Sequence, residues 1–172
     1  MPKRATRLLS PLMLLVCMQP AAGLACAVIP PEKLAEVRTR HVEAFKAEVA
    51  AIREEADLIF VGYLGRLTFS EQTATSAAGQ AHVLRTYQAV FRPHQQIKGD
   101  YREGQVLDYT VNMNRVVVGC GPEFRLLPKE NGAGETYLVY ARDGKIIRTN
   151  RIPTDTQALS AYEETAFIRE LH

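Results

Sequence analysis

The chain has 172 residues, with 21 Lys and Arg against 19 Asp and Glu and a formal net charge of +2. Three of these cations lie in the first seven residues, so the rest of the chain carries 18 cations against 19 anions. Because a nucleic-acid-binding surface needs an excess of Lys and Arg to meet the phosphates, this balance excludes nucleic acid as an expected partner.

Residues 1–25 have the pattern of a secretory signal peptide. Lys3, Arg4 and Arg7 precede the apolar run LLSPLMLLVCM, and the small residues PAAGLA follow it. The apolar run is too short to span a bilayer. We therefore expect cleavage before Cys26 and a secreted or periplasmic protein, in which residues 26–172 form a single domain.

Two cysteines remain once the signal peptide is removed. Cys17 leaves with the signal, whereas Cys26 and Cys120 enter an oxidising compartment as an even pair. Thiols in such compartments normally pair, so we predict a disulfide between Cys26 and Cys120. The bridge would close a loop of 120 − 26 = 94 residues. For a loop of that length the chain-entropy estimate of the stabilisation is about 4–5 kcal/mol.

Lipidation of Cys26 is the alternative. Bacterial lipoprotein signals have Leu or a similar residue three positions before the cysteine, but here Gly23 holds that position and Leu24 comes one place later. A lipidated Cys26 would anchor the domain to a membrane. The misplaced leucine favours the disulfide.

A long helix is predicted between Pro31 and Ala56. Apolar residues recur there at spacings of three to five among Glu, Lys and Arg, with prolines at the start, which predicts an amphipathic helix. His41 lies on or near the apolar side, where a lone histidine is more often packed than metal-ligating. The apolar positions are Leu34, Val37, Val42, Phe45, Val49 and Ile52.

Strand-like runs follow the helix. Residues 56–69 form a β-rich run in which Gly62 and Gly65 predict a bulge or a bend. We expect a polar loop over 70–80, because small and polar residues dominate it.

The second expected strand covers about 82–91. Pro93 is expected to break it, and Gly99 to close the region. The third run, GQVLDYTVN, alternates and places Leu107, Tyr109 and Val111 on one face.

The clearest hairpin signal is GETYLVYARDGKIIRT. Asp143-Gly144 suits a type I′ turn between two strands. The alternation of side chains places Leu138 and Tyr140 on one face, with Tyr137 and Val139 on the other.

A second helix is expected near the C-terminus. Thr154, Asp155 and Thr156 are the candidates for its N-cap. Five short strands flanked by two helices predict a mainly β fold, a small bent barrel of the OB type. The apolar set of the second helix is Leu159, Tyr162, Phe167, Ile168 and Leu171.

Enzymatic motifs are absent from the sequence. It contains no His-Glu-x-x-His, Gly-x-Ser-x-Gly, Cys-x-x-Cys or phosphate-loop pattern, and the histidines His41, His82, His94 and His172 lack metal-ligand spacing. The acidic cluster of Glu54, Glu55 and Asp57 is of a kind that is usually solvated. We therefore expect no catalytic residues, no cofactor and no intrinsic metal, and hence no enzyme.

Five segments occur in the order CAVIPP, ADLIFVG, QQIKGD, GCGPEF and GETYLVYARDGKIIRTN. Taken in this order, they resemble the N-terminal domain of the tissue inhibitors of metalloproteinases and the wider netrin-like group of secreted OB-folds. The order and rough spacing of the segments match over nearly all of residues 26–172. Two departures occur together: Val28 and Asn150 stand where the family has the two halves of a second disulfide. The family's third disulfide is missing as well.

The resemblance implies a mode of action. In this family the α-amine and carbonyl of the first cysteine chelate the zinc of a metalloprotease, which assigns that role to Cys26. Ala27 then enters the specificity pocket, and Cys120 holds the terminus through the disulfide. The implied contact ridge is Cys26, Ala27, Val28, Val118, Gly119 and Gly121. The alternative is a binding or structural module of the cell envelope with a protein or glycan partner.

Overall fold

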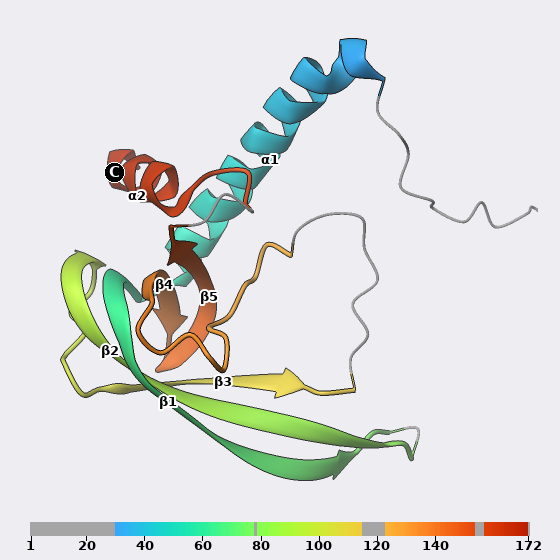
Figure 1. The fold of residues 1–172 in the computed structure, drawn as a ribbon, viewed down its shortest axis with the longest axis vertical. Coiled ribbons are helices and arrows are strands. Elements are labelled where there is room, and N and C mark those ends of the chain that lie inside the picture. The colour runs from blue at the N-terminus through green and yellow to red at the C-terminus, as the bar shows by residue number, and fades with distance from the viewer. Residues whose placement is uncertain (1–29, 78, 115–122, 154–156, 172) are drawn as a thin grey trace, which may run out of the picture.

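The computed structural model describes residues 30–77, 79–114, 123–153 and 157–171. Its fold is mainly β, with five strands and two α-helices, as the sequence predicts (Figure 1). The elements are a 3₁₀ turn Pro31–Lys33, α1 Leu34–Glu55, β1 Leu58–Thr75, β2 Ala81–Lys98, β3 Val106–Asn112, β4 Thr136–Arg142, β5 Lys145–Ile152 and α2 Ala161–Glu170.

The five strands form one closed sheet in the order β1-β2-β3-β5-β4, with β4 returning to β1. Every neighbouring pair is antiparallel except β3 and β5. Those two are parallel and meet at a single pair, Asp108 opposite Lys145. The ladder between β3 and β5 is therefore the shortest in the sheet. The candidate site described below lies beside this junction.

Strand β4 is buried on both faces, and its alternation separates two hydrophobic cores. Tyr137 and Val139 point into the closed sheet, whereas Leu138 and Tyr140 face the two helices. This confirms the predicted alternation of the hairpin. The helices lie together over one end of the sheet, so the second core fills the space between them and the strands (Figure 1).

Strand β2 is longer than predicted, because Pro93 does not end it. Beyond Val90, which is opposite Val106, β2 no longer pairs with β3 and bonds only to β1. Pro93 lies in this one-sided stretch, opposite Gly62 at a shift of register. A proline lacks the amide donor of a ladder but is tolerated at an edge or a bulge, so the strand continues to Lys98.

The prediction of a loop over 70–80 is also wrong for residues 70–75, which belong to a strand. Strand β1 runs to Thr75, and pairs such as Phe69 with Tyr87 extend the ladder far from the closed part of the sheet. The result is a long, curved β1–β2 ribbon (Figure 1). Small and polar residues such as Thr are acceptable here, because the ribbon exposes much of its surface.

The predicted bulges at the glycines of β1 are confirmed. The register shifts between Val61 and Gly62, and again between Leu64 and Arg66, where Gly65 has no partner on β2. Such insertions increase the local bend of a strand. They allow β1 to pair with β4 at one end and to follow β2 along the ribbon at the other.

The β4–β5 hairpin turns at Asp143-Gly144, as predicted. Both residues have positive φ, 51° and 74°, which is the backbone of a type I′ turn. Asp57 fixes the turn from outside, since its Oδ2 accepts the Asp143 amide at 2.8 Å. A side chain at position 144 would meet open space, so only the backbone conformation demands glycine there.

Replacing Gly144 by Ala is expected to destabilise the protein by about 1 kcal/mol, the cost of a left-handed residue with a Cβ. Gly65→Ala is the matched control, because position 65 has no positive φ and its Cβ would make ordinary contacts. Urea unfolding of both variants measures the difference. Equal free energies of unfolding for the two variants would contradict the turn assignment.

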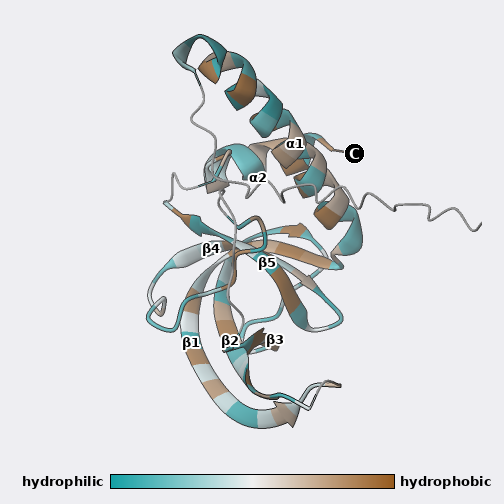
Figure 2. Cartoon of the chain, turned by 90° about the vertical axis from the view of Figure 1, so that its right-hand side faces the viewer, coloured by the Kyte–Doolittle hydropathy of each residue, from teal (hydrophilic) through white to brown (hydrophobic). Residues whose placement is uncertain are grey.

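Helix α1 packs on the sheet only through its C-terminal half. Phe45, Val49 and Ile52 are buried, whereas Leu34 remains 51% exposed and Val37 is only partly covered. The expected helix is thus confirmed, but its apolar side reaches the core over half of its length. The N-terminal half projects away from the sheet, and hydrophobic and hydrophilic positions alternate along the whole helix (Figure 2). No described helix is both long and apolar enough to cross a membrane.

Helix α2 begins later than predicted. Its N-cap is Ser160 and not one of Thr154, Asp155 and Thr156, which lie outside the described residues. Ser160 and Glu163 form a capping box, in which Ser160 Oγ accepts from the Glu163 amide and the Glu163 carboxylate accepts from the Ser160 amide at 2.8 Å. The Ser-x-x-Glu spacing was visible in the sequence.

Candidate functional site

The residues of the predicted N-terminal site lie outside the described part of the chain. These are Cys26, Ala27, Val28, Val118, Gly119, Cys120 and Gly121. The predicted disulfide and contact ridge therefore stay predictions. Two sites of other kinds are formed by the described residues.

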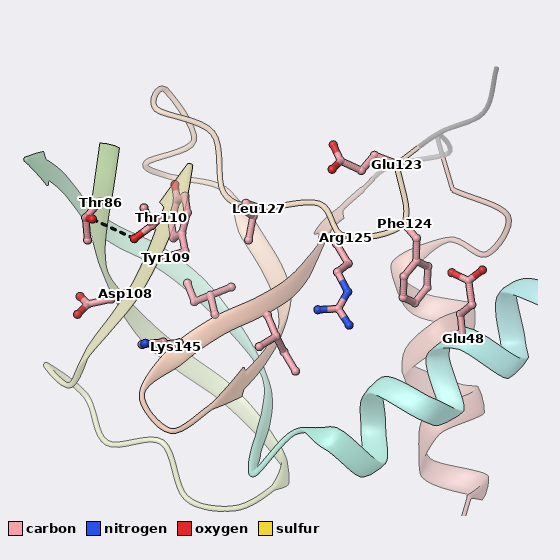
Figure 3. A pocket seen from close by; sticks show the side chains of 12 residues that line it. Glu48, Thr86, Asp108, Tyr109, Thr110, Glu123, Phe124, Arg125, Leu127 and Lys145 are labelled. Carbon is pink, nitrogen blue, oxygen red and sulfur yellow. Dashed lines mark hydrogen bonds between the residues drawn. The ribbon is translucent and has the colours of Figure 1, made fainter. Parts of the chain in front are cut away.

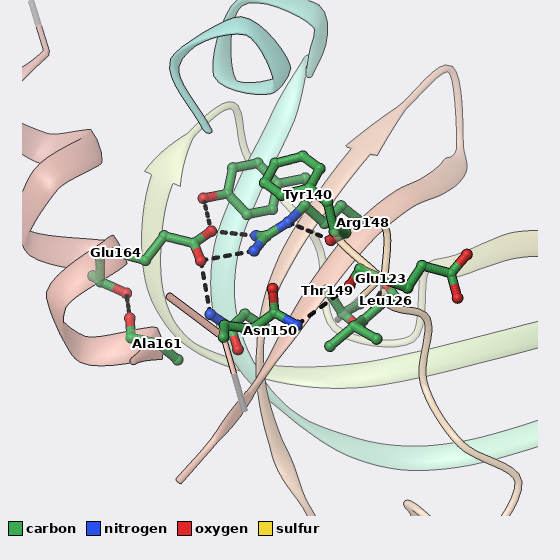
Figure 4. Close-up of polar contacts among 11 residues, drawn as sticks. Glu123, Leu126, Tyr140, Arg148, Thr149, Asn150, Ala161 and Glu164 are labelled. Atoms are coloured by element: carbon green, nitrogen blue, oxygen red, sulfur yellow. Dashed lines mark hydrogen bonds and ion pairs between the residues drawn. The ribbon is translucent and has the colours of Figure 1, made fainter. Parts of the chain in front are cut away.

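The first is a buried polar cluster between α2 and β5 (Figure 4). Glu164 and Arg148 are both fully buried and form an ion pair, with Arg148 Nη2 2.8 Å from Glu164 Oε2. Tyr140 donates to Oε1 of the same carboxylate at 2.5 Å, and Asn150 donates to Oε2 at 2.7 Å. Each oxygen of the Glu164 carboxylate thus accepts hydrogen bonds from two side chains.

Aromatic rings surround the Arg148 guanidinium. Its carbon lies 4.4 Å from the Phe124 ring centroid and 5.4 Å from that of Phe45. Arg148 Nε also donates to the Phe124 carbonyl at 3.0 Å. The cluster therefore joins α1, α2, β4, β5 and the segment before β4 at one point.

This cluster is structural in character. A buried ion pair offsets its desolvation only when hydrogen bonds satisfy both groups, as they do here, and loss of one partner costs about 3–5 kcal/mol. Burial raises the pKa of Tyr140 well above 10, and the negative charge of Glu164 raises it further. Tyr140 accordingly stays protonated at pH values where an unfolded tyrosine ionises.

Stability is expected to fall as the pH rises above about 10, since the unfolded chain then releases a proton that folded Tyr140 retains. Tyr140→Phe removes this contribution. The variant is less stable at pH 7, by about 1–3 kcal/mol for the lost hydrogen bond to a buried charge, but the deficit narrows above pH 10.

Chemical denaturation between pH 7 and 11 measures this change. Tyr162→Phe is the control for the loss of a tyrosine hydroxyl, because the Tyr162 side chain is 68% exposed. If the loss of stability caused by Tyr140→Phe stays constant up to pH 11, Tyr140 has the same pKa in the folded and the unfolded chain, which would contradict the prediction.

The segment 123–128 lies beside β5 and near β3, next to the single pair that joins these two strands. Its alternate carbonyls bond to the sheet: that of Leu126 accepts from the Thr149 amide at 2.7 Å, and that of Pro128 accepts from the Tyr109 hydroxyl at 2.6 Å. The Phe124 ring packs edge-on against Phe45 of α1, with centroids 5.3 Å apart. The segment is thereby fixed beside β5 without being a strand of the sheet.

The second site is an open groove beside this segment, which we call the β3 groove (Figure 3). It has a volume of about 780 Å³, and a further hollow of about 500 Å³ adjoins it and shares Thr110, Glu123, Arg125 and Leu127. Its lining residues are Glu48, Thr86, Asp108, Tyr109, Thr110, Glu123, Phe124, Arg125, Leu127, Lys145, Ile146 and Ile147.

Polar groups at one end of the groove converge on β3. The hydroxyls of Thr86 and Thr110 are 2.9 Å apart, and Asp108 lies beside them with Lys145 across the sheet junction. Asp108 Oδ1 is buried, and among the described residues it has no hydrogen-bond partner. Such an oxygen is costly to leave without a donor. Asn150 Oδ1 and Gln157 Oε1 share this state among the described residues, and of the three residues only Asp108 lines the groove.

The other residues considered from the sequence do not gather into a metal site. No group of three or more His, Cys, Asp or Glu that could hold a metal occurs among the described residues. Glu55 and Asp57 of the acidic cluster hold partners instead: Glu55 pairs with Arg125 at 3.3 Å, and Asp57 accepts the Asp143 amide. Both residues stay accessible to solvent, since Asp57 is exposed and Glu55 is partly exposed.

Sequence reasoning missed both sites. No sequence signal indicates that Arg148 and Glu164 are buried, because charged residues on a strand and a helix are normally exposed. Asp108 and Lys145 lie far apart in sequence and meet only through the parallel junction. No known protein-family model matches the chain, and no curated protein matches it.

Proposed function

We propose that the protein is an exported OB-fold domain that binds a partner protein and has no catalytic activity, with a zinc metalloprotease as the partner of Cys26. The observation that carries the proposal is the strand order β1-β2-β3-β5-β4, closed by the pairing of β1 with β4. An OB-fold is a barrel of five strands, and a closed sheet of five strands agrees with it. It supports the resemblance to the tissue inhibitors of metalloproteinases, because the segments ADLIFVG, QQIKGD and GETYLVYARDGKIIRTN lie along β1, β2, β4 and β5.

The length of the chain permits the proposed disulfide between Cys26 and Cys120. Phe124 packs on Phe45, and the rise of the helical turns places Pro30 about 24 Å from Phe45 along α1. Each cysteine is four residues from one of these anchors, Cys26 from Pro30 and Cys120 from Phe124. Two extended segments of that length and the bridge itself span about 33 Å, which leaves about 9 Å beyond the distance along α1 for the separation between the Phe45 and Phe124 backbones.

In the proposed complex the disulfide holds the new N-terminus rigid, and the α-amine and carbonyl of Cys26 occupy the open coordination position of the protease zinc. Ala27 enters the specificity pocket. Its methyl group buries little area, and so it adds little affinity at about 25 cal/mol per Å². We therefore expect zinc ligation by Cys26 to supply most of the binding free energy.

A second candidate function is a binding module of the cell envelope that recognises another protein or a glycan. The β3 groove favours it, because it combines an apolar floor with the partnerless Asp108 oxygen. This function does not require Cys26. The protein would be membrane-associated in either case only if Cys26 were lipidated.

The test of zinc ligation compares the exported protein with a form that carries one additional residue before Cys26. The mature form is expected to inhibit at least one member of a panel of zinc metalloproteases, and the extended form to lose inhibition by about a hundredfold or more, because its amine can no longer reach the metal.

Two controls accompany this assay. Intact mass must show a mature chain that begins at Cys26, without lipid and with no free thiol, and both forms must unfold at the same temperature. Equal inhibition by the two forms, or inhibition by neither, would refute zinc ligation and leave the binding-module function.

A further inference from the structure

We propose that the β3 groove binds an extended peptide segment of a partner protein, which adds as a strand to the open edge of β3. The proposal rests on the binding function above in that it requires a protein partner. It does not depend on Cys26 or on a protease.

The first step concerns the edge of β3. Its whole length pairs with β2, from Val106 opposite Val90 to Asn112 opposite Leu84. On the other side, within the described residues, the ladder to β5 consists of the single pair of Asp108 and Lys145. Among the residues that the structure describes, strand β3 therefore has one side fully bonded and another that is unpaired after Asp108.

The second step identifies which backbone groups point outward. The Asp108 amide donates to the Gly144 carbonyl at 3.0 Å, away from β2, whereas the Met113 amide donates to Val83 of β2. Because amides alternate in direction along a strand, Thr110 has the direction of Asp108. Its N–H and C=O are thus directed toward the groove, at the spacing that an added strand requires.

The third step is the shape and chemistry of the space beside this edge. The two adjoining hollows run along β3, and Ile146, Ile147 and Leu127 provide apolar contacts for side chains of an added strand. An extended peptide presents a donor and an acceptor at every second residue, which matches a strand edge. Volumes of about 780 and 500 Å³ accommodate several residues of such a peptide.

The charges of the groove indicate the preferred side chains. Glu48, Asp108 and Glu123 outnumber Arg125 and Lys145, and the Arg125 guanidinium is already paired with Glu55. A Lys or Arg in the peptide would supply the donor that Asp108 Oδ1 lacks. We therefore expect bound peptides to carry a basic residue beside the one that pairs with Thr110.

The experiment uses random peptides displayed on phage, selected on the mature protein and then synthesised for titration. Peptides enriched in β-branched and basic residues are expected to bind. Thr110→Pro should weaken binding by about tenfold or more, because it removes the outward N–H. It leaves the bonds to β2 intact, since those come from the neighbouring residues.

Two controls distinguish the contribution of the β3 backbone from that of the side chains. Thr110→Val removes the hydroxyl but keeps the N–H, so it should bind the peptides as the unmodified protein does. Asp108→Asn should abolish the preference for a basic residue, whereas Asp100→Asn on an exposed loop should not. Thermal unfolding must show that Thr110→Pro folds as stably as Thr110→Val to within a few degrees.

Three outcomes would overturn the proposal: no peptide is enriched, Thr110→Pro binds the peptides as well as Thr110→Val, or a glycan array yields ligands that depend on Asp108 while peptides do not bind. The readout is independent of protease inhibition. The N-terminally extended form should bind peptides normally, and Thr110→Pro should inhibit a metalloprotease normally, so that failure of one function can be distinguished from failure of the other.

Discussion

The buried ion pair between Arg148 and Glu164 is the interaction on which the arrangement of strands and helices depends. Both side chains are fully removed from water, so neither can be separated from the other without leaving an uncompensated charge in the core. Glu164 comes from α2 and Arg148 from β5, and Arg148 also bonds to the carbonyl of Phe124. This contact therefore fixes the C-terminal helix against the sheet and holds the segment 123–128 beside β5.

The same cluster includes Asn150. Asn150 stands where the resemblance would place a late cysteine, and in this protein it is fully buried and donates to Glu164 at 2.7 Å. The end of the hairpin is thus tied to α2 by hydrogen bonds, at the position where the family has a covalent link. The fixed segment 123–128 in turn forms one wall of the β3 groove.

Much of the fold was predictable because local physics determines it. The Asp143-Gly144 turn needs positive φ, the alternation along β4 follows from strand geometry, and the long helix follows from its apolar spacing. The errors came from tertiary context. Pro93 looked like a strand end, but it lies where β2 has one neighbour only, and the pairing that extends β1 to Thr75 depends on β2. The β3 groove was not predictable, since Asp108 and Lys145 meet only through the closure of the sheet. The resemblance-based site at Cys26 and Cys120 is a separate matter, because it rests on residues outside the described ranges.

The most direct test of the central role of the ion pair is a double-mutant cycle by urea unfolding, with Arg148→Met, Glu164→Gln and the two combined. Each single change should cost about 3–5 kcal/mol, because it leaves the remaining partner buried and incompletely paired. The combined change should cost much less than the sum of the two, with a coupling free energy of about 2 kcal/mol or more. Additive costs would contradict the account, since they would mean that Arg148 and Glu164 stabilise the protein independently and that their pairing does not hold α2 to the sheet.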